Sequence, residues 1–258
     1  MPMPQNTISN HSQFARPLLK GRLIKRYKRF FADVLLDNGE LVTAHCPNTG
    51  KMTGCAEPGF IAWVQPNDNP KRKLKYTLEL VQNTQGHWIG VNTHRANAVV
   101  FAALQAQKIT QFTDVIHIQK EVSYGQEKSK IDFLLTCTDN SQIYVEVKSV
   151  TLHNSTNNVG FFPDTVSVRA HKHCRELMYL LQTQPKITAN ALTLVPIRAV
   201  MLYLVQHTGI KSVAPATHID PNYADLITEA KAAGVEFLSY DCFINEENIY
   251  INQQLTFS

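Results

Sequence analysis

The chain has 258 residues, of which 44% are hydrophobic and 18% are charged, and its formal net charge is +4. This composition is typical of an ordinary globular protein and excludes a disordered chain. No apolar run approaches the roughly 20 residues of a membrane-spanning helix, and the start, MPMPQNTISNHSQ, lacks a secretory signal. We therefore expect a cytoplasmic protein with no membrane partner. The five cysteines are scattered without a C-x-x-C pair, which predicts free thiols rather than disulfides or a zinc site.

The positive charge is concentrated in the first third of the chain. Residues 1–85 contain 12 Lys and Arg against 6 Asp and Glu, whereas residues 86–258 contain 13 against 15. Much of the excess lies in KGRLIKRYKRFF (residues 20–31), where cations suited to phosphates alternate with aromatic rings suited to exposed bases. The alternative is a solvated edge strand whose lysines prevent aggregation. We predict a nucleic acid as the partner, bound by the following residues: Arg22, Lys25, Arg26, Lys28 and Arg29.

Residues 1–85 are expected to form a small all-β domain. Short apolar runs separated by turn residues predict five strands, which suits an antiparallel barrel of the oligonucleotide-binding (OB) type. The runs are RLIKRY, RFFADVLL, LVTAHC, FIAWVQ and KYTLELVQN. The Gly- and Pro-containing segment AHCPNTGKMTGC (residues 44–55) interrupts them. Its residues Asn48, Thr49 and Gly50 form either a ligand-binding loop or a plain connecting turn.

Residues 86–258 are expected to form an α/β domain with a mixed sheet flanked by helices. Helical spacing of apolar residues predicts a helix over residues 92–107, and the turn TDNS joins two strands into a hairpin. A second helix follows FPD, with Asp164 as its cap, and VEFLSYD is expected to be the last strand. Strands are predicted at residues 115–124, 130–137, 143–150 and 198–206, and a third helix at 221–234.

The hairpin carries the main candidate site. Residues two apart on a strand share a face, so Glu146 and Lys148 point the same way, and Asp132 lies across the hairpin within reach. Two carboxylates are the minimum oxygen cage for Mg²⁺ or Mn²⁺, and an ammonium group can stabilise charge on a phosphate. The alternative is an ion pair between Glu146 and Lys148 on a solvent-exposed face. We predict Asp132, Glu146 and Lys148 as the catalytic residues of a phosphodiesterase.

This arrangement resembles the PD-(D/E)xK nuclease superfamily, whose core has the same order of elements. The phrases RYKRFFADV, CPNTGKM, KIDFLL, YVEVKSVTL and FPDTVSVRAHKHCREL closely resemble the bacterial sugar fermentation stimulation protein A family. That resemblance implies a DNA-binding protein with an OB-like domain, a nuclease-like domain and a regulatory link to sugar catabolism, notably maltose genes. Many superfamily members add an acid from the first core helix, but residues 94–107 contain none. We expect Glu121 to replace it as a metal ligand beside Asp132 and Glu146.

The helix after the motif carries a second group of polar residues. Arg169, Lys172, His173 and Glu176 are spaced along one stripe of that helix. Arg169 and Lys172 could hold the phosphates that flank a scissile bond, and the alternative is an exposed surface network. Three functions stay open: a Mg²⁺-dependent DNA nuclease, a DNA-binding regulator with a catalytically silent nuclease fold, and a sugar- or nucleotide-sensing protein.

Overall fold

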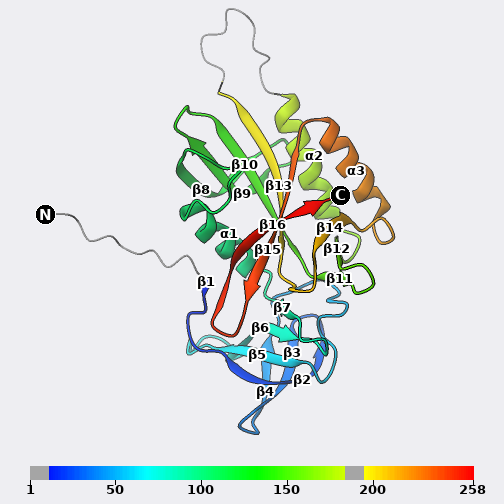
Figure 1. Cartoon of the computed structure of the whole chain (residues 1–258). Coiled ribbons are helices and arrows are strands. Elements are labelled where there is room, and N and C mark those ends of the chain that lie inside the picture. The colour runs from blue at the N-terminus through cyan, green and yellow to red at the C-terminus, as the bar shows by residue number, and fades with distance from the viewer. Residues whose placement is uncertain (1–11, 184–194) are drawn as a thin grey trace, which may run out of the picture.

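The computed structural model describes residues 12–183 and 195–258; residues 1–11 of the expected first domain lie outside them. A small barrel lies below a larger domain that carries helices on both faces of a long sheet (Figure 1). All five cysteines are buried and free, as the sequence predicts. No helix within the described residues is long and apolar enough to cross a membrane.

The barrel is a closed antiparallel sheet with an OB-like order of strands. Its order is β4-β3-β2-β5-β6, and a short parallel pairing of β4 with β6 closes it. Alternate residues fill the interior, where Leu23, Val34 and Leu78 are fully buried. A further strand, β7, pairs with β6 and lies beyond the expected domain boundary at residue 85. The strands are β2 (Leu19–Tyr27), β3 (Phe31–Leu36), β4 (Leu41–His45), β5 (Ile61–Pro66), β6 (Tyr76–Gln82) and β7 (Trp88–Gly90).

The larger domain is a mixed sheet with the order β11-β12-β14-β16-β15-β13-β10-β9-β8. The central strands β10, β13 and β15 run parallel, and β9 and β8 continue the sheet in antiparallel pairing. The elements are α1 (Arg95–Gln105), β8 (Val115–Tyr124), β9 (Ser129–Cys137), β10 (Gln142–Val150), β11 (Leu152–Asn154), β12 (Val159–Phe162), α2 (Val168–Gln182), β13 (Ile197–Val205), β14 (Ser212–Pro215), α3 (Pro221–Ala232), β15 (Glu236–Ile244) and β16 (Asn248–Phe257).

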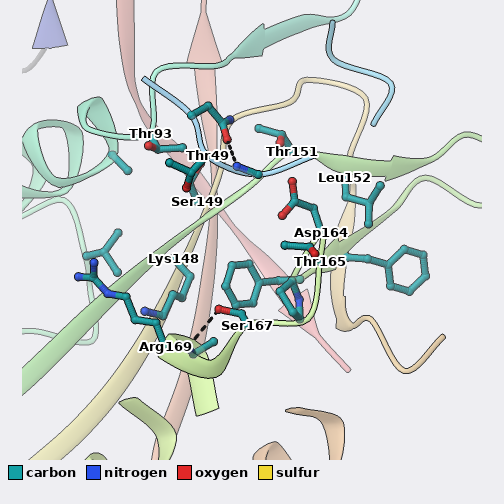
Figure 2. Close-up of a pocket in the computed structure, with 18 of the residues that line it drawn as sticks. Thr49, Thr93, Lys148, Ser149, Thr151, Leu152, Asp164, Thr165, Ser167 and Arg169 are labelled. Carbon is teal, nitrogen blue, oxygen red and sulfur yellow. Dashed lines mark hydrogen bonds between the residues drawn. The ribbon is translucent and has the colours of Figure 1, made fainter. Parts of the chain in front are cut away.

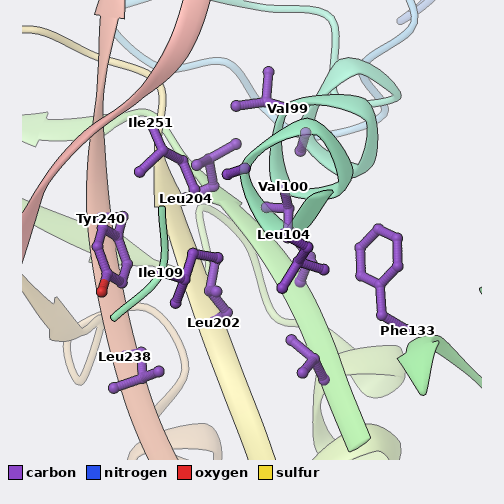
Figure 3. Packing of buried hydrophobic residues seen from close by; sticks show 14 of the residues in the cluster. Val99, Val100, Leu104, Ile109, Phe133, Leu202, Leu204, Leu238, Tyr240 and Ile251 are labelled. Atoms are coloured by element: carbon purple, nitrogen blue, oxygen red, sulfur yellow. The ribbon is translucent and has the colours of Figure 1, made fainter. Parts of the chain in front are cut away.

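Each face of the sheet has its own hydrophobic core. On one face, Val100 and Leu104 of α1 pack against Leu202 of β13 and Tyr240 of β15 (Figure 3). On the other face, α2 and α3 cover the intervening residues of β13, including the fully buried Tyr203. The continuously apolar run of β13 is therefore explained by burial on both sides.

Several details differ from the sequence-based expectations. The chain continues past β15 into β16, and three short strands, β11, β12 and β14, extend the sheet. The cap of α2 is Ser167, whose side chain accepts a hydrogen bond from the backbone N–H of Ala170 at 3.2 Å. Asp164 instead accepts one from the backbone N–H of Met52 in the barrel, so it connects the two domains.

The short strand β1 (Ser12–Gln13) also connects them, because it pairs with β16 of the larger sheet before the chain enters the barrel. The ring of Phe14, the next residue, lies 4.4 Å from the guanidinium of Arg95 at the start of α1. The chain segment that forms the barrel is therefore attached to the larger domain both before its first strand and after its last.

Candidate functional site

Asp132 lies where strands β9 and β10 separate. Their antiparallel pairing ends with Phe133 opposite Val145, so the backbone N–H of Val147 has no partner on β9. The side chain of Asp132 replaces that partner: its Oδ2 accepts a hydrogen bond from Val147 N at 2.7 Å. Its Oδ1 accepts one from the amide of Asn97 on α1, also at 2.7 Å. The end of the pairing thus fixes a carboxylate beside the next residues of β10.

Glu146 and Lys148 share one face of β10, as the strand period predicts, and they form an ion pair of 2.7 Å. The pair is not solvent-exposed, because Glu146 is 1% exposed and Lys148 is 9% exposed. The Nδ1 of His173 on α2 lies 3.0 Å from the Lys148 ammonium and in contact with the Glu146 carboxylate. This nitrogen can accept from Lys148 or donate to Glu146, but not both at once. The alternative of a solvated pair is therefore wrong.

The two carboxyl groups have opposite pKa shifts. Burial, and then the charge of Glu146, raises the pKa of Asp132 from 3.8 to about 6. Burial also disfavours the charged form of Glu146, but Lys148 and His173 outweigh it and hold the pKa of Glu146 below its ordinary value. Glu146 is therefore a carboxylate with a cationic partner, Lys148. Asp132 is costly to ionise unless positive charge is added nearby.

These carboxylates fit a hard divalent cation. The Oε2 of Glu146 is buried and has no hydrogen-bond partner among the described residues, which is unusual for a carboxylate oxygen. Asp132 and Glu146 are oxygen donors of the kind that Mg²⁺ and Mn²⁺ prefer. On α1, the first core helix, the side chain that faces Asp132 is the amide of Asn97 rather than an acid. Sequence reasoning missed Asn97, and the absence of an acid in this helix was the available signal.

A cavity of about 310 Å³ extends from Lys148 into the space between the two domains. The barrel contributes Asn48, Thr49 and Gly50 to its lining, and the larger domain contributes Lys148 and the start of α2 with Arg169 (Figure 2). A neighbouring hollow is lined by Asp132, Glu146, Lys148 and Arg169. The predicted loop and Lys148 therefore line one cavity, and Asp132 and Glu146 line the hollow beside it.

Arg26 shapes the barrel's side of this cavity. Its guanidinium donates to the backbone carbonyls of Arg29, Asn48, Gly50 and Lys51, at 2.8 to 3.4 Å. These bonds give Arg26 a structural role in holding the loop. The buried side chain of Asn48 adds a hydrogen bond from its amide to Val91 O and another from Gly50 N to its Oδ1.

The other predicted DNA-binding residues of the barrel lie on β2 and the turn that follows it. Arg22, Lys25, Lys28 and Arg29 are exposed, and Phe30 beside them is 45% exposed. Lys28 and Arg29 have positive φ angles of 48° and 62°, so the turn is tight. Cations and an aromatic ring are thus accessible together at this turn.

The stripe predicted on α2 is divided by burial. Arg169 is exposed at the cavity, and Lys172 is half-buried, with its ammonium donating to Glu127 O at 2.6 Å. His173 and Glu176 are buried, so the alternative of an exposed surface network is wrong. Sequence reasoning placed His173 on this helix face but missed its contact with Lys148 and Glu146.

The predicted third metal ligand, Glu121, lies on β8. Its side chain is exposed, and its backbone has a positive φ of 54°. The described residues that line the hollow around Asp132 do not include it.

Two family models match the chain: "SfsA N-terminal OB domain" over residues 24–91 and "Sugar fermentation stimulation protein RE domain" over residues 94–248. The sugar fermentation stimulation protein homolog of Pseudoalteromonas atlantica is 50% identical over 243 residues, which cover 94% of this chain and 98% of that protein. The homolog of Shewanella frigidimarina is 46% identical over 239 residues, with coverages of 93% and 96%.

Among solved structures, that of Pyrococcus furiosus SfsA in complex with Ca²⁺ matches with a TM-score of 0.81 at 23% sequence identity. The match covers 95% of this chain and 97% of that one, so the two proteins share a fold. The expected architecture, an OB-like barrel followed by a mixed-sheet domain, is confirmed. The chain belongs to the sugar fermentation stimulation protein family.

Proposed function

We propose that this protein binds DNA and hydrolyses its phosphodiester bonds with Mg²⁺ or Mn²⁺ at Asp132 and Glu146. The observation that carries the proposal is the meeting of two carboxylates and an ammonium on adjacent strands beside a cavity, with Glu146 Oε2 left without a partner. The Ca²⁺ in the Pyrococcus furiosus structure supports a divalent ion in the family.

Each side chain of the cluster has a distinct role in this proposal. Asp132 and Glu146 would hold a divalent ion, which would polarise the scissile phosphate and lower the pKa of a water molecule bound to it. Lys148 stabilises negative charge on the phosphate oxygens, and His173 holds its ammonium in place. Asn97 orients Asp132 through their 2.7 Å hydrogen bond. Arg169, exposed at the edge of the hollow, binds a neighbouring phosphate.

The barrel supplies most of the DNA affinity in this proposal. Its exposed cations would contact phosphates, and Phe30 offers a surface on which a base can stack. The loop at Asn48, Thr49 and Gly50 would guide the strand toward Lys148, because both line the same cavity.

A cleavage assay tests the proposal. The full chain is incubated with single-stranded, duplex and branched DNA in Mg²⁺, Mn²⁺ or EDTA, beside Glu146→Gln. Glu229→Gln, a change of the same kind on the exposed face of α3, is the matched control. We expect metal-dependent cleavage that Glu146→Gln abolishes and Glu229→Gln leaves unchanged. Glu121→Gln is a third arm: a loss of cleavage assigns Glu121 as a ligand, and full activity removes it from the site.

A second candidate is a DNA-binding regulator whose nuclease fold is silent. The surroundings of Asp132 favour this candidate, because both oxygens of Asp132 already accept hydrogen bonds and α1 offers no acid as a further metal ligand. DNA binding without cleavage of any substrate in either metal would select this candidate. The resemblance also implies a link to sugar catabolism. Measuring maltose-gene transcripts in a strain from which this protein has been deleted tests that link.

A further inference from the structure

Three histidines meet at the junction between the barrel and the larger domain, away from the carboxylates. His87 directly precedes β7, His153 lies in β11, and His207 lies two residues after the end of β13. Each offers one ring nitrogen, and these three atoms all lie within 4.8 Å of one another. Within residues 12–183 and 195–258, no other group of three His, Cys, Asp or Glu residues has this spacing.

Backbone contacts between β7 and the segment after β13 hold two of these rings together. His207 forms an isolated bridge with Ile89, and Gly90 N donates to Gln206 O at 2.8 Å. Gly209 completes the approach, because a Cβ at this position would lie 2.6 Å from Nδ1 of His87. A side chain at residue 209 is therefore incompatible with the present place of His87.

The ring nitrogens of two histidines are available as ligands. Nδ1 of His87 is buried and has no hydrogen-bond partner in the part of the chain that the structure describes. Nε2 of His153 contacts Oδ1 of Asn158 at 3.2 Å; if it donates there, Nδ1 keeps its lone pair. His207 is constrained, since its Nδ1 accepts from Gly209 N at 3.0 Å. It becomes a ligand when the ring turns away from this bond and its free nitrogen faces the other two histidines.

Burial disfavours the charged form of two of the three rings. Burial, and then the neighbouring His153, lowers the pKa of His87. Burial, followed by His153 and His87, lowers the pKa of His207 to about 3. Both shifts favour the uncharged ring, which is the form that binds metal ions.

We propose that His87, His153 and His207 form a second metal site, selective for a borderline-soft divalent ion such as Zn²⁺. Imidazole ligands suit Zn²⁺, whereas the carboxylates of the first site suit Mg²⁺. A tetrahedral zinc site needs nitrogens about 3.3 Å apart, given Zn–N bonds of about 2.0 Å, so small ring rotations close the group. Asn158 serves as the outer partner that fixes the tautomer of His153.

The coordination sphere keeps an open position. A cavity of about 220 Å³ is lined by His153, His207 and Ser155, so a water molecule can reach the ion. Three histidines with one solvent-accessible position are the donor set of a reactive zinc site. Because His87 belongs to the barrel side of the junction and the other two to the larger domain, the ion would also cross-link the two.

Zinc titration of the full chain tests the proposal. The protein carries Asp132→Asn and Glu146→Gln to remove the first site and is freed of metal with EDTA and dialysis. Calorimetry measures Zn²⁺ binding, and the visible absorption of Co²⁺ reports the geometry of coordination. His87→Gln and His153→Gln remove ligands, and His117→Gln, an exposed histidine on β8, is the matched control.

We expect one Zn²⁺ per chain and intense Co²⁺ bands typical of tetrahedral coordination. His87→Gln and His153→Gln should each weaken binding more than about 100-fold, since even outer partners contribute about 10–100-fold. Asn158→Ala should weaken Zn²⁺ binding by about 10–100-fold. His117→Gln should bind Zn²⁺ as tightly as the parent protein. The absence of zinc binding and cobalt bands in the parent overturns the proposal whether or not the variants fold. Equal binding by the parent and both ligand variants also overturns it.

Discussion

Replacing Asp132 by Asn should stabilise the metal-free protein at high pH. The rise in the pKa of Asp132 from 3.8 to about 6 corresponds to about 3 kcal/mol of folding free energy, at roughly 1.4 kcal/mol per pKa unit. A protonated aspartic acid has the shape of asparagine, and the amide of Asn97 can turn its oxygen toward the new NH2 group, so the variant resembles the neutral form of the wild type. Above about pH 6 the wild type must bury a charge near Glu146 that the variant lacks.

The sign follows from proton binding. Between pH 3.8 and about 6 the folded state holds a proton on Asp132 that the unfolded state has lost, so wild-type stability falls as pH rises through this window. The advantage of Asp132→Asn should be about 3 kcal/mol at about pH 8 and about 1 kcal/mol at about pH 4.5.

Urea unfolding of both proteins in EDTA, followed by circular dichroism at each pH, measures this difference. A variant less stable than the wild type at high pH would refute the reasoning. A difference that does not change with pH would refute it as well.

Three further predictions concern the cluster of Asp132, Glu146 and Lys148 and the exposed cations of the barrel. Mg²⁺ or Mn²⁺ should raise the melting temperature of the wild type and of Lys148→Ala but not of Glu146→Gln, because only the carboxylate is a ligand; scanning calorimetry without DNA checks this, and equal responses in all three would contradict it. Lys148→Ala should lower any cleavage rate by about two to four orders of magnitude in a single-turnover assay, and an unchanged rate would exclude its catalytic role. Arg22→Ala and Lys28→Ala should each weaken DNA binding, and each should reduce the slope of log affinity against log salt concentration by about one, without changing the melting temperature. Arg26→Ala should instead lower the melting temperature, because four backbone carbonyls lose their donor. Fluorescence anisotropy measures the DNA affinity, and thermal melts measure the stability.

The order of the long strands and helices up to β15 was readable from the sequence because each of them carries either a clear period or a continuous apolar run. The hairpin of β9 and β10 and the apolar run of β13 are examples. The short strands β11, β12 and β14 have only three or four residues each, too few for a period to be visible. The missed strand β16 did carry a signal, since Ile249 and Ile251 alternate with more exposed residues.

The site was predictable only in part, because sequence spacing gives faces of single elements and not contacts between them. The strand period placed Glu146 and Lys148 on one face. It could not show that His173 lies against both, or that Asn97 bonds to Asp132. Asp164 illustrates the same limit: Asp164 and Ser167 are both good helix caps, and the contact with Met52 N of the barrel decides between them.

The attachment of the barrel at both ends of its chain segment affects how DNA bound on the barrel would reach the two carboxylates. Because β1 and Phe14 hold one end of the barrel and α1 holds the other, DNA bound on the barrel under the proposed function would reach Asp132 and Glu146 as an intramolecular partner at a high effective concentration. A protease cut in the segment after Phe14 would release one of the two tethers. Cleavage by the nicked protein should then require more substrate, with a higher KM and an unchanged kcat, since the carboxylate cluster itself stays intact.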